Sequence, residues 1–489
     1  MTAAVIDSAP TTHRWSRPAL ARWSRRAIVA SSVAAIVGAC AHGRSAVRSG
    51  SAGAAGAPNQ LPSAQIIRVR VDRFVAPYVA MRDFSGTILL AQGGHVLVSR
   101  AYGFADFERR LEPDDHTVYG VGSITKTITA AAIELLAARG QLTLTDPITK
   151  YLRGFAPGDS ITITNLLEHS SGMKDYYSWP SYAVGQASPI SQADFLAQLQ
   201  AQPLDFPPGT KSSYSNSGYF ILAAIIERVS GMPYREFIER NLFRPLGMNE
   251  SGDLQDQVQV SGLASGYDAG FAPSRVQRAA EVSRSWLEGN GSVYASAPDL
   301  YRWLQATRDE TITKLGTLSY PFGWGKRTRF GRKLLEQNGR VPIGYASYVA
   351  LYPDDDLIVV VLSNIQSEVT DQLGTGLAAI VLGQAYEVPP IRPGSANLPT
   401  SDSATFVAYA GRYEIAPGFA LTVQSGAQGI LIAGPDGAFL PVDYEGSDRF
   451  FFRTLYVPVS FERDSTRRIR ALDWNGQFKA KRVDAPPHR

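Results

Sequence analysis

A serine and a lysine one helical turn apart are the side chains in this sequence best suited to do chemistry. They lie in the segment Ser123-Ile-Thr-Lys126, at the start of a helix expected over residues 124–139 and closed by Gly140. Residues three apart share one face of a helix, so the hydroxyl and the amine should lie close together. A serine is a weak nucleophile until a neighbour removes its proton, and burial can lower the pKa of a lysine enough for that role. The pair predicts nucleophilic catalysis by Ser123.

The spacing alone is a weak signal, because a second segment has it too. Ser171 and Lys174 are also three residues apart, but a glycine lies between them and no helix is expected to follow. The start of a helix favours developing negative charge, and the backbone N–H of Ser123 is well placed to donate to an oxyanion. Of the two pairs we therefore favour Ser123 and Lys126, although on spacing alone an ordinary capped helix explains such a pair more often than catalysis does.

The tripeptide Tyr214-Ser-Asn216 can supply a second base and an amide. A tyrosine near a lysine ammonium ionises more easily, and an amide can hold a substrate carbonyl. The alternative is a turn tyrosine followed by a capping serine or asparagine, before a helix expected over residues 219–229. Taken alone, the tripeptide favours the structural alternative.

The elements that must position these residues predict an α+β body. Hairpin patterns lie near both of its ends, at residues 87–101 and 345–362, with helical patterns between them. This order predicts an antiparallel sheet closed by chain ends, with a helical insertion. Short apolar strands after residue 404 predict a small antiparallel barrel or sandwich.

Composition divides the 489 residues into five parts. Stretches rich in Gly, Ala and Ser, or in Pro, predict linkers on either side of the body. The expected parts are a signal peptide at 1–40, a linker at 41–64, the body at 65–387, a linker at 388–403 and a β unit at 404–489.

The first 40 residues predict export. An arginine-rich stretch precedes thirteen uncharged residues, 27–39, too few for the ~20 that span a bilayer. The only cysteine, Cys40, follows this run and resembles the acylated cysteine of a bacterial lipobox. We expect a protein of the periplasm or cell envelope, lipid-anchored at Cys40; a small-residue cleavage site with a chance cysteine is the alternative.

Charge and histidine spacing exclude several classes of function. The first 40 residues hold five arginines and one acid, so the rest of the chain is neutral and predicts no nucleic-acid partner. The six histidines are not at ligand spacing, and neither a metal nor a cofactor is expected. A Ser-His-Asp hydrolase using His95, His116 or His169 is a rival interpretation.

From about residue 86 to 364, the chain resembles the serine β-lactamase and penicillin-binding protein family. The resemblance is to the branch with class C β-lactamases, D-alanyl-D-alanine carboxypeptidases and related esterases. It is carried, in family order, by residues 119–126, 161–172, 206–210, 214–216, 245–248 and 291–300. It implies a β-lactamase-like antiparallel sheet flanked by helices with a helical subdomain, and the last unit is similar to the lipocalin-like β domain of some members.

The resemblance also implies roles for matched residues. Ser123 would be acylated, and Lys126 and Tyr214 would share general-base and general-acid duty, with the first proton acceptor left open. Asn216 would bind the acyl carbonyl or stabilise Lys126. The oxyanion hole would pair the N–H of Ser123 with one on the strand that carries the third motif. His169 matches a structural loop residue.

The third motif departs from the family pattern. The family shows Lys-Thr-Gly or His-x-Gly, whereas Gln337-Asn338-Gly339 stands here, so the cation that meets a substrate carboxylate is missing. The N–H of Arg340 would be the second oxyanion donor. Its side chain is expected to be solvated at an exposed strand end; the alternative is that it turns inward and replaces the missing cation. One residue is inserted around Ile343. We count residues 337–340 as candidate substrate-binding residues.

These features predict an exported serine hydrolase that forms an acyl-enzyme on Ser123, an esterase or amidase acting on a neutral acyl substrate. A β-lactamase or D,D-peptidase is the alternative within enzymes. A catalytically silent lipoprotein that binds cell-wall or lipid fragments is the alternative outside them. The expected partners are small esters, amides or peptides, and a membrane only through the N-terminal lipid.

Overall fold

The computed structural model describes residues 63–154, 158–270, 276–309, 322–392, 404–417, 419–426, 429–434 and 439–483. Cys40 and the expected signal peptide therefore lie outside the described residues. Within the described ranges, no helix combines the length and the apolar character needed to cross a membrane.

A six-stranded antiparallel sheet forms the centre of the body, in the order β2-β1-β11-β10-β9-β8. The two ends of the body meet in it, because Thr87 of β1 lies opposite Leu362 of β11. This confirms the α+β sheet closed by chain ends. The strands are β1 (Gly86–Gln92), β2 (His95–Tyr102), β8 (Gly325–Arg329), β9 (Arg332–Val341), β10 (Tyr345–Tyr352) and β11 (Leu357–Ser363).

Both faces of this sheet are covered by helices. Every residue of β11 is buried, as expected for an unbroken run of branched aliphatic side chains. Val359 and Val361 pack in the core formed with α2 (Ala64–Ala80) and α11 (Val369–Val381). Val360 and Leu362 point the other way, into the larger core shared with the helical part. The two-residue period of a strand thus builds two cores from one segment.

The helical part begins directly after the Ser123 turn. α3 starts at Thr125 and is entered through the short 3-10 helix η1 (Gly122–Ile124). α7 starts at Asn216, three residues before the expected start, because Ser215 caps it by accepting from the N–H of Gly218. The helices are α3 (Thr125–Ala138), α4 (Ile163–Leu167), α5 (Pro180–Gly185), α6 (Gln192–Gln200), α7 (Asn216–Ser230), α8 (Tyr234–Ile238) and α9 (Ala297–Arg308).

Two small sheets lie outside the central sheet, and one of them holds the segment before Ser123. β3 (Tyr119–Gly120) and β4 (Gly252–Asp253) both pair with β7 (Val293–Ala295), so the strand before the serine is held from the side. The second small sheet lies beside the turn between β9 and β10, where the N–H of Tyr267 donates to the Gly344 carbonyl oxygen at 3.1 Å. It contains β5 (Tyr267–Ala269), β6 (Val276–Arg278) and β12 (Ile365–Gln366).

The last unit is a closed eight-stranded antiparallel barrel, which decides between the two expected architectures. Its core is aromatic, with the Phe450 and Phe461 rings 5.4 Å apart. It is preceded by α12 (Ala404–Val407). The strands are β13 (Gly411–Ala416), β14 (Phe419–Ser425), β15 (Gly429–Ala433), β16 (Phe439–Gly446), β17 (Arg449–Phe452), β18 (Val457–Arg463), β19 (Ile469–Trp474) and β20 (Phe478–Arg482).

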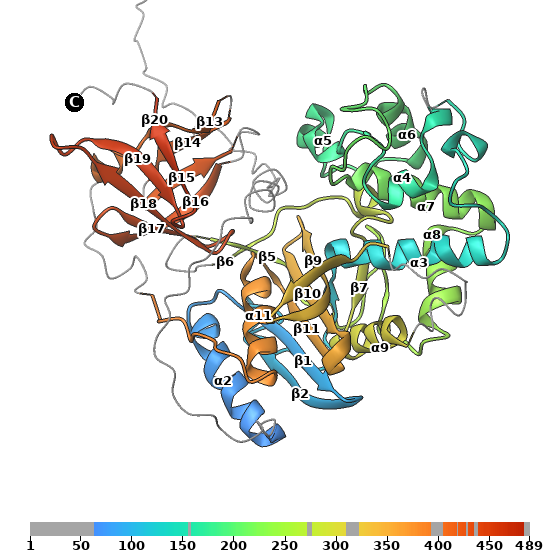
Figure 1. Ribbon diagram of the computed structural model, residues 1–489, viewed down its shortest axis with the longest axis horizontal. Helices are drawn as coiled ribbons and strands as arrows, with labels where there is room; N and C mark the ends of the chain where they lie inside the picture. Colours follow the sequence, from blue (N-terminus) through green and yellow to red (C-terminus); the bar gives the residue numbers. More distant parts are fainter. Residues whose placement is uncertain are drawn as a thin grey trace, which may run out of the picture.

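The barrel is packed against the body. Figure 1 shows the barrel, in red, and the green helices α4–α8 as two lobes above the central sheet. Tyr456 of the barrel joins the α2–α11 core, where its ring lies 5.6 Å from that of Tyr78. Arg453 Nε donates to Asp83 Oδ1 at 2.7 Å, and both residues are 5% exposed. A buried ion pair and shared apolar packing therefore fix this contact.

Candidate active site

Ser123 sits in η1, at the point where the chain passes from β3 into α3. The turn depends on Gly122, whose φ of 55° is in the left-handed region. A Cβ on Gly122 would also come within 2.7 Å of the Arg340 backbone nitrogen on β9. Glycine thus lets the serine segment lie directly against the third-motif strand.

Lys126 is completely buried one turn into α3. Its Nζ lies 3.0 Å from Ser123 Oγ, 2.8 Å from Asn216 Oδ1 and 2.7 Å from the Asn290 carbonyl oxygen. Burial lowers the pKa of Lys126 from 10.5 to about 7, and the charge of Asp175 opposes that shift. The amine is therefore available in its neutral form near neutral pH, as the sequence predicted for a buried lysine.

Tyr214 approaches Ser123 from the loop before α7. Its Oη lies 2.5 Å from Ser123 Oγ, and its ring centroid lies 4.8 Å from Lys126 Nζ. Although 46% of the residue is exposed, loss of water around the phenol raises its pKa above the ordinary value of 10. The expectation of an easily ionised tyrosine is therefore wrong: desolvation outweighs the hydrogen bond with Ser123, which alone lowers the pKa, and Tyr214 holds its proton.

Asn216 joins Lys126 to an acid that the sequence did not single out. Its backbone N–H and its Nδ2 both donate to Asp175 Oδ2, at 3.0 and 2.9 Å. Asp175 also accepts from the N–H of Tyr177 at 2.9 Å and so caps η4 (Tyr176–Ser178). Burial raises the pKa of this carboxyl above its ordinary value, while its hydrogen bonds and Lys126 oppose the shift. Asp175 comes three residues after the family-like run 161–172, and that proximity was the available signal.

Asn290 is a second missed residue, and it acts through its backbone. Its carbonyl oxygen accepts from Lys126, while its own amide Nδ2 donates to the carbonyls of Trp286 and Glu288. Every residue has a backbone carbonyl, so the residue type at position 290 does not reveal this acceptor. Its position next to the family-like segment 291–300 was the only hint.

The third-motif strand lies beside the serine turn. Gln337 Nε2 donates to the Ser123 carbonyl oxygen at 3.2 Å, and Ser347 Oγ on β10 donates to the Val121 carbonyl oxygen at 2.7 Å. A Cβ on Gly339 would come within 2.0 Å of that same Val121 oxygen. The neutral amide of Gln337 thus stands on the serine side of the strand, and Gly339 allows the two backbones to touch.

The side chains of Asn338 and Arg340 point to the opposite face, toward α11. Asn338 Nδ2 donates to Asp371 Oδ1 at 2.7 Å. Arg340 forms ion pairs with Asp371 and with Glu368, the latter at 2.7 Å, and its side chain is 14% exposed. The expectation of a solvated Arg340 is wrong, because the two acids at the start of α11 bind it. Neither side chain reaches Ser123, and only the Arg340 backbone lies beside the serine turn.

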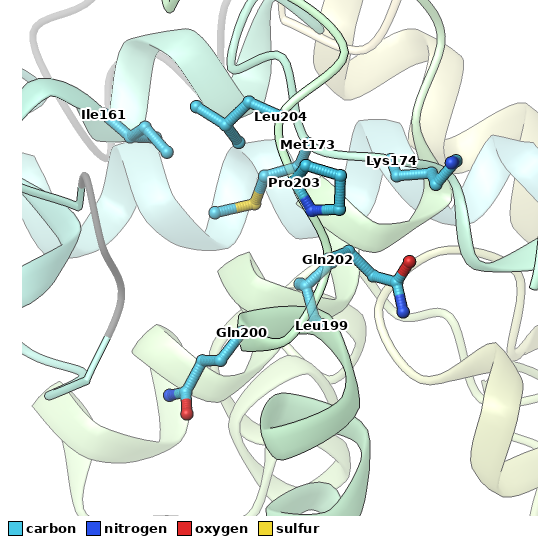
Figure 2. Close-up of a pocket in the computed structure, with 8 residues that line it drawn as sticks. All are labelled: Ile161, Met173, Lys174, Leu199, Gln200, Gln202, Pro203 and Leu204. Atoms are coloured by element: carbon cyan, nitrogen blue, oxygen red, sulfur yellow. The ribbon is translucent and has the colours of Figure 1, made fainter.

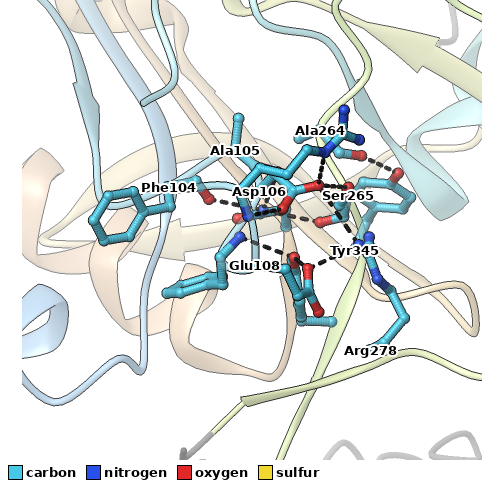
Figure 3. Close-up of polar contacts among 12 residues, drawn as sticks. Phe104, Ala105, Asp106, Glu108, Ala264, Ser265, Arg278 and Tyr345 are labelled. Carbon is cyan, nitrogen blue, oxygen red and sulfur yellow. Dashed lines mark hydrogen bonds and ion pairs between the residues drawn. The ribbon is translucent and has the colours of Figure 1, made fainter. Parts of the chain in front are cut away.

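The turn between β9 and β10 takes up the inserted residue. Residues 342–344 connect the strands, and the N–H of Gly344 donates to the Val341 carbonyl at 3.0 Å. The next residue, Tyr345, packs under Gly120 and donates its hydroxyl to the Ala264 carbonyl. Figure 3 shows this contact beside the Asp106–Ser265 hydrogen bond, which is 2.8 Å long. Residues 342–344 follow the third-motif segment, so Gln337 and the Arg340 backbone still lie beside the serine turn.

His169 supports the site without touching the serine. Its Nδ1 accepts from the N–H of Ser215 at 3.1 Å, and its ring lies 4.7 Å from the Tyr214 ring. Burial lowers the pKa of His169 to about 3, so the ring is neutral. His116 instead pairs with Glu250 at the surface, and His95 is exposed on β2. In the ranges given above, no hydrogen bond joins any of the three histidines to Ser123.

The other serine–lysine pair is not assembled. Ser171 is buried and its Oγ accepts from the N–H of Met173, as in a turn. Lys174 lies at the edge of a shallow hollow lined by Met173 and Leu204 (Figure 2). Ser171 and Lys174 therefore lie in different environments and do not form a second serine–lysine pair.

An α+β body with a serine between a buried lysine and a tyrosine defines a hydrolase-like class of protein. The chain belongs to the Beta-lactamase family, whose family model matches residues 71–382. Members of this family are typically serine hydrolases.

Known relatives include both penicillin-binding proteins and an esterase. The chain is 29% identical over 410 residues to Penicillin-binding protein 4* of Bacillus subtilis, covering 78% of this chain and 90% of the relative. It is 30% identical over 281 residues to Esterase EstB of Burkholderia gladioli, covering 50% and 70%. The octameric penicillin-binding protein homologue from Pyrococcus abyssi shares the fold, with a TM-score of 0.57 at 22% identity over 84% of this chain and 99% of that one.

Proposed function

We propose that this protein is a serine hydrolase that forms an acyl-enzyme on Ser123 and acts on neutral esters or amides. The observation that carries the proposal is the double contact of Ser123 Oγ, with Lys126 Nζ at 3.0 Å and with Tyr214 Oη at 2.5 Å. A nucleophile that touches both a base and an acid can exchange protons with each.

Counting protons favours Lys126 as the base. The Asn216 Oδ1 and Asn290 carbonyl oxygens can only accept, so each takes one N–H of Lys126. A neutral amine then has no N–H left, and its lone pair points to Ser123 Oγ. Tyr214, which keeps its proton, can donate to that same oxygen.

The reaction then balances within these three residues. Ser123 Oγ attacks the acyl carbon as its proton passes to Lys126, and Tyr214 donates its proton to the leaving alcohol or amine. Lys126 returns its proton to Tyr214. The oxyanion would lie between the backbone N–H groups of Ser123 and Arg340. Water then attacks the acyl carbon as one of its protons passes to Lys126. The bond to Ser123 Oγ breaks, that proton returns to Oγ, and the acid is released.

The charges around Ser123 favour a neutral substrate. Gln337 is uncharged, and Arg340 is bound to two acids on the far face of the sheet. Asp175 adds a carboxyl close behind Asn216. A substrate carboxylate would thus meet no cation from the third motif, and an esterase is among the relatives.

Substrate turnover tests the proposal. Purified residues 41–489 should hydrolyse p-nitrophenyl acetate and butyrate, and Ser123→Ala should abolish turnover while remaining folded. Faster hydrolysis of a penicillin or a D-Ala-D-Ala peptide than of either ester would favour the β-lactamase or D,D-peptidase alternative, which the penicillin-binding relatives support. If neither class of substrate is turned over in a Ser123-dependent way, the catalytically silent binding protein is the remaining alternative.

We also propose export, with a lipid anchor on Cys40. The support is the position of this sole cysteine at the end of the apolar run. Cys40→Ala should move the protein from the membrane to the soluble fraction of the cell envelope. An unchanged distribution would contradict the anchor.

A further inference from the structure

We propose that Asp175 is a positioning residue, which fixes the amide of Asn216 so that the lone pair of Lys126 is directed at Ser123. This inference rests on the proposed function. It adds a residue outside the Ser-Lys-Tyr group and assigns a direction to each hydrogen bond behind it.

The orientation of the Asn216 amide is the step that Asp175 controls. An asparagine can present either its oxygen or its nitrogen to a neighbour, and the two ends are almost equal in size. Asp175 Oδ2 accepts from both the backbone N–H and Nδ2 of Asn216. The nitrogen end must therefore face Asp175, and the oxygen end must face Lys126.

A reversed amide would remove the base. Its N–H groups would point at Lys126 Nζ, and a neutral amine could accept such a bond only with its lone pair. That lone pair is the one the mechanism needs for the proton of Ser123. In the observed orientation of the Asn216 amide, the lone pair of Lys126 is free to accept the proton of Ser123. In the reversed orientation, that lone pair is already occupied.

Asp175 is itself held from several sides. Its Oδ1 accepts from the N–H of Tyr177, and the N–H of Tyr176 donates to Ser217 Oγ on α7 at 2.9 Å. The buried hydroxyl of Tyr176 donates to the Trp286 carbonyl at 2.7 Å. The Asp175 carboxylate thus accepts three N–H hydrogen bonds, from the backbone of Tyr177 and from the backbone and side chain of Asn216. These bonds fix its position and favour its charged form.

The charge of Asp175 acts on Lys126 as well. It favours the ammonium form and so opposes the effect of burial. The tyrosines at 176, 177 and 214 hold their protons, because burial raises the pKa of each. His169 is neutral above a pKa of about 3. Removing the carboxylate should therefore shift the titration of Lys126 to lower pH.

The test is Asp175→Asn, measured as a pH profile with p-nitrophenyl butyrate. Loss of an oriented hydrogen bond to a charged group predicts a fall in kcat of roughly 10- to 100-fold. KM should change little, and the acid limb of kcat/KM should move to lower pH. Asp194→Asn, which removes an exposed acid beside Ser191 at the start of α6, is the matched control and should leave both unchanged.

A double-mutant cycle with Asn216 distinguishes a positioning role of Asp175 from a general loss of folding in Asp175→Asn. Asn216→Ala removes the amide through which Asp175 acts, so adding Asp175→Asn to that variant should lower kcat little further. Equal losses of kcat in both backgrounds, or an acid limb that stays in place, would overturn the role of Asp175. Wild-type activity in Ser123→Ala would overturn the proposed function instead, so the two failures are distinguishable.

Discussion

The backbone carbonyl of Asn290 accepts a hydrogen bond from Lys126 Nζ at 2.7 Å. This bond and the one to Asn216 occupy two N–H groups of the lysine. The third position of the amine faces Ser123 Oγ, and its protonation state decides whether it donates or accepts there. The activity should therefore follow the titration of one buried amine.

Activity should rise with pH through the pKa of Lys126, which is about 7. Below this pH the ammonium donates to Ser123 Oγ and cannot take its proton, and above it the neutral amine can. The measurement is kcat/KM for p-nitrophenyl butyrate from pH 5 to 9. A profile that is flat across this range, or that falls on crossing pH 7, contradicts Lys126 as the base.

The stability of the folded protein should also depend on this lysine. Between about pH 7 and 10.5, the unfolded chain keeps a proton on Lys126 that the folded chain has lost, so the free energy of unfolding rises with pH in that window. Lys126→Met removes this contribution. The stability of the variant relative to the wild type should therefore decline as pH rises from 7 to 10, measured by urea unfolding. A difference independent of pH would count against the lowered pKa.

Arg340 should stabilise the strand next to Ser123 without binding substrate. Arg340→Met leaves Glu368 and Asp371 without their cation, and breaking such a pair costs about 3–5 kcal/mol. Arg327→Met on β8 removes a side chain that is 66% exposed and should cost less than about 1 kcal/mol. Urea unfolding of both variants is the measurement. Equal stabilities of the two variants would contradict the stabilising role of Arg340, and a defect of Arg340→Met limited to KM would show that Arg340 binds substrate.

Gln337 should control the preference for neutral substrates. Gln337→Lys places a cation on the serine side of β9, where Gln337 now donates to the Ser123 carbonyl. A charge-assisted hydrogen bond to a substrate carboxylate should raise kcat/KM for carboxylate-bearing substrates over neutral esters by roughly tenfold. Competition between a p-nitrophenyl ester and its carboxylated analogue measures this ratio. An unchanged ratio would mean that this position does not face the substrate.

The contact between barrel and body should depend on Arg453. Arg453→Met leaves Asp83 buried without its nearest cation, a loss of about 3–5 kcal/mol. Arg470→Met, in a surface pair on the barrel with its side chain 62% exposed, is the matched control and should cost less than about 1 kcal/mol. Two separated unfolding transitions in Arg453→Met would show a released barrel. A wild-type unfolding curve would contradict the importance of the pair.

The sequence was sufficient for the fold and for the residues that touch Ser123. Hydrophobic alternation and glycine turns placed strands at both ends of the body, and the sheet joins them at Thr87 and Leu362. Spacing and family resemblance brought Ser123, Lys126, Tyr214 and Asn216 together. These features are local or carried by residue type, so they are visible in a single chain.

What the sequence did not show depends on tertiary contacts. The side of β9 on which Arg340 lies is set by strand register, and its partners are supplied by α11, 28 and 31 residues away. The direction of the Tyr214 pKa shift depends on burial, which residue type does not reveal. Asp175 acts on Lys126 through Asn216, and the Asn290 carbonyl accepts from Lys126 directly, so both contacts join segments far apart in the chain.

Intact-protein mass spectrometry after rapid mixing with an activated ester tests the central claim most directly. With p-nitrophenyl butyrate at pH 8, the wild type should gain one butyryl group, located on the peptide that contains Ser123. Ser123→Ala should gain none, and Lys126→Met should acylate far more slowly. An acyl group on another residue, or an equal adduct in Ser123→Ala, would contradict the account.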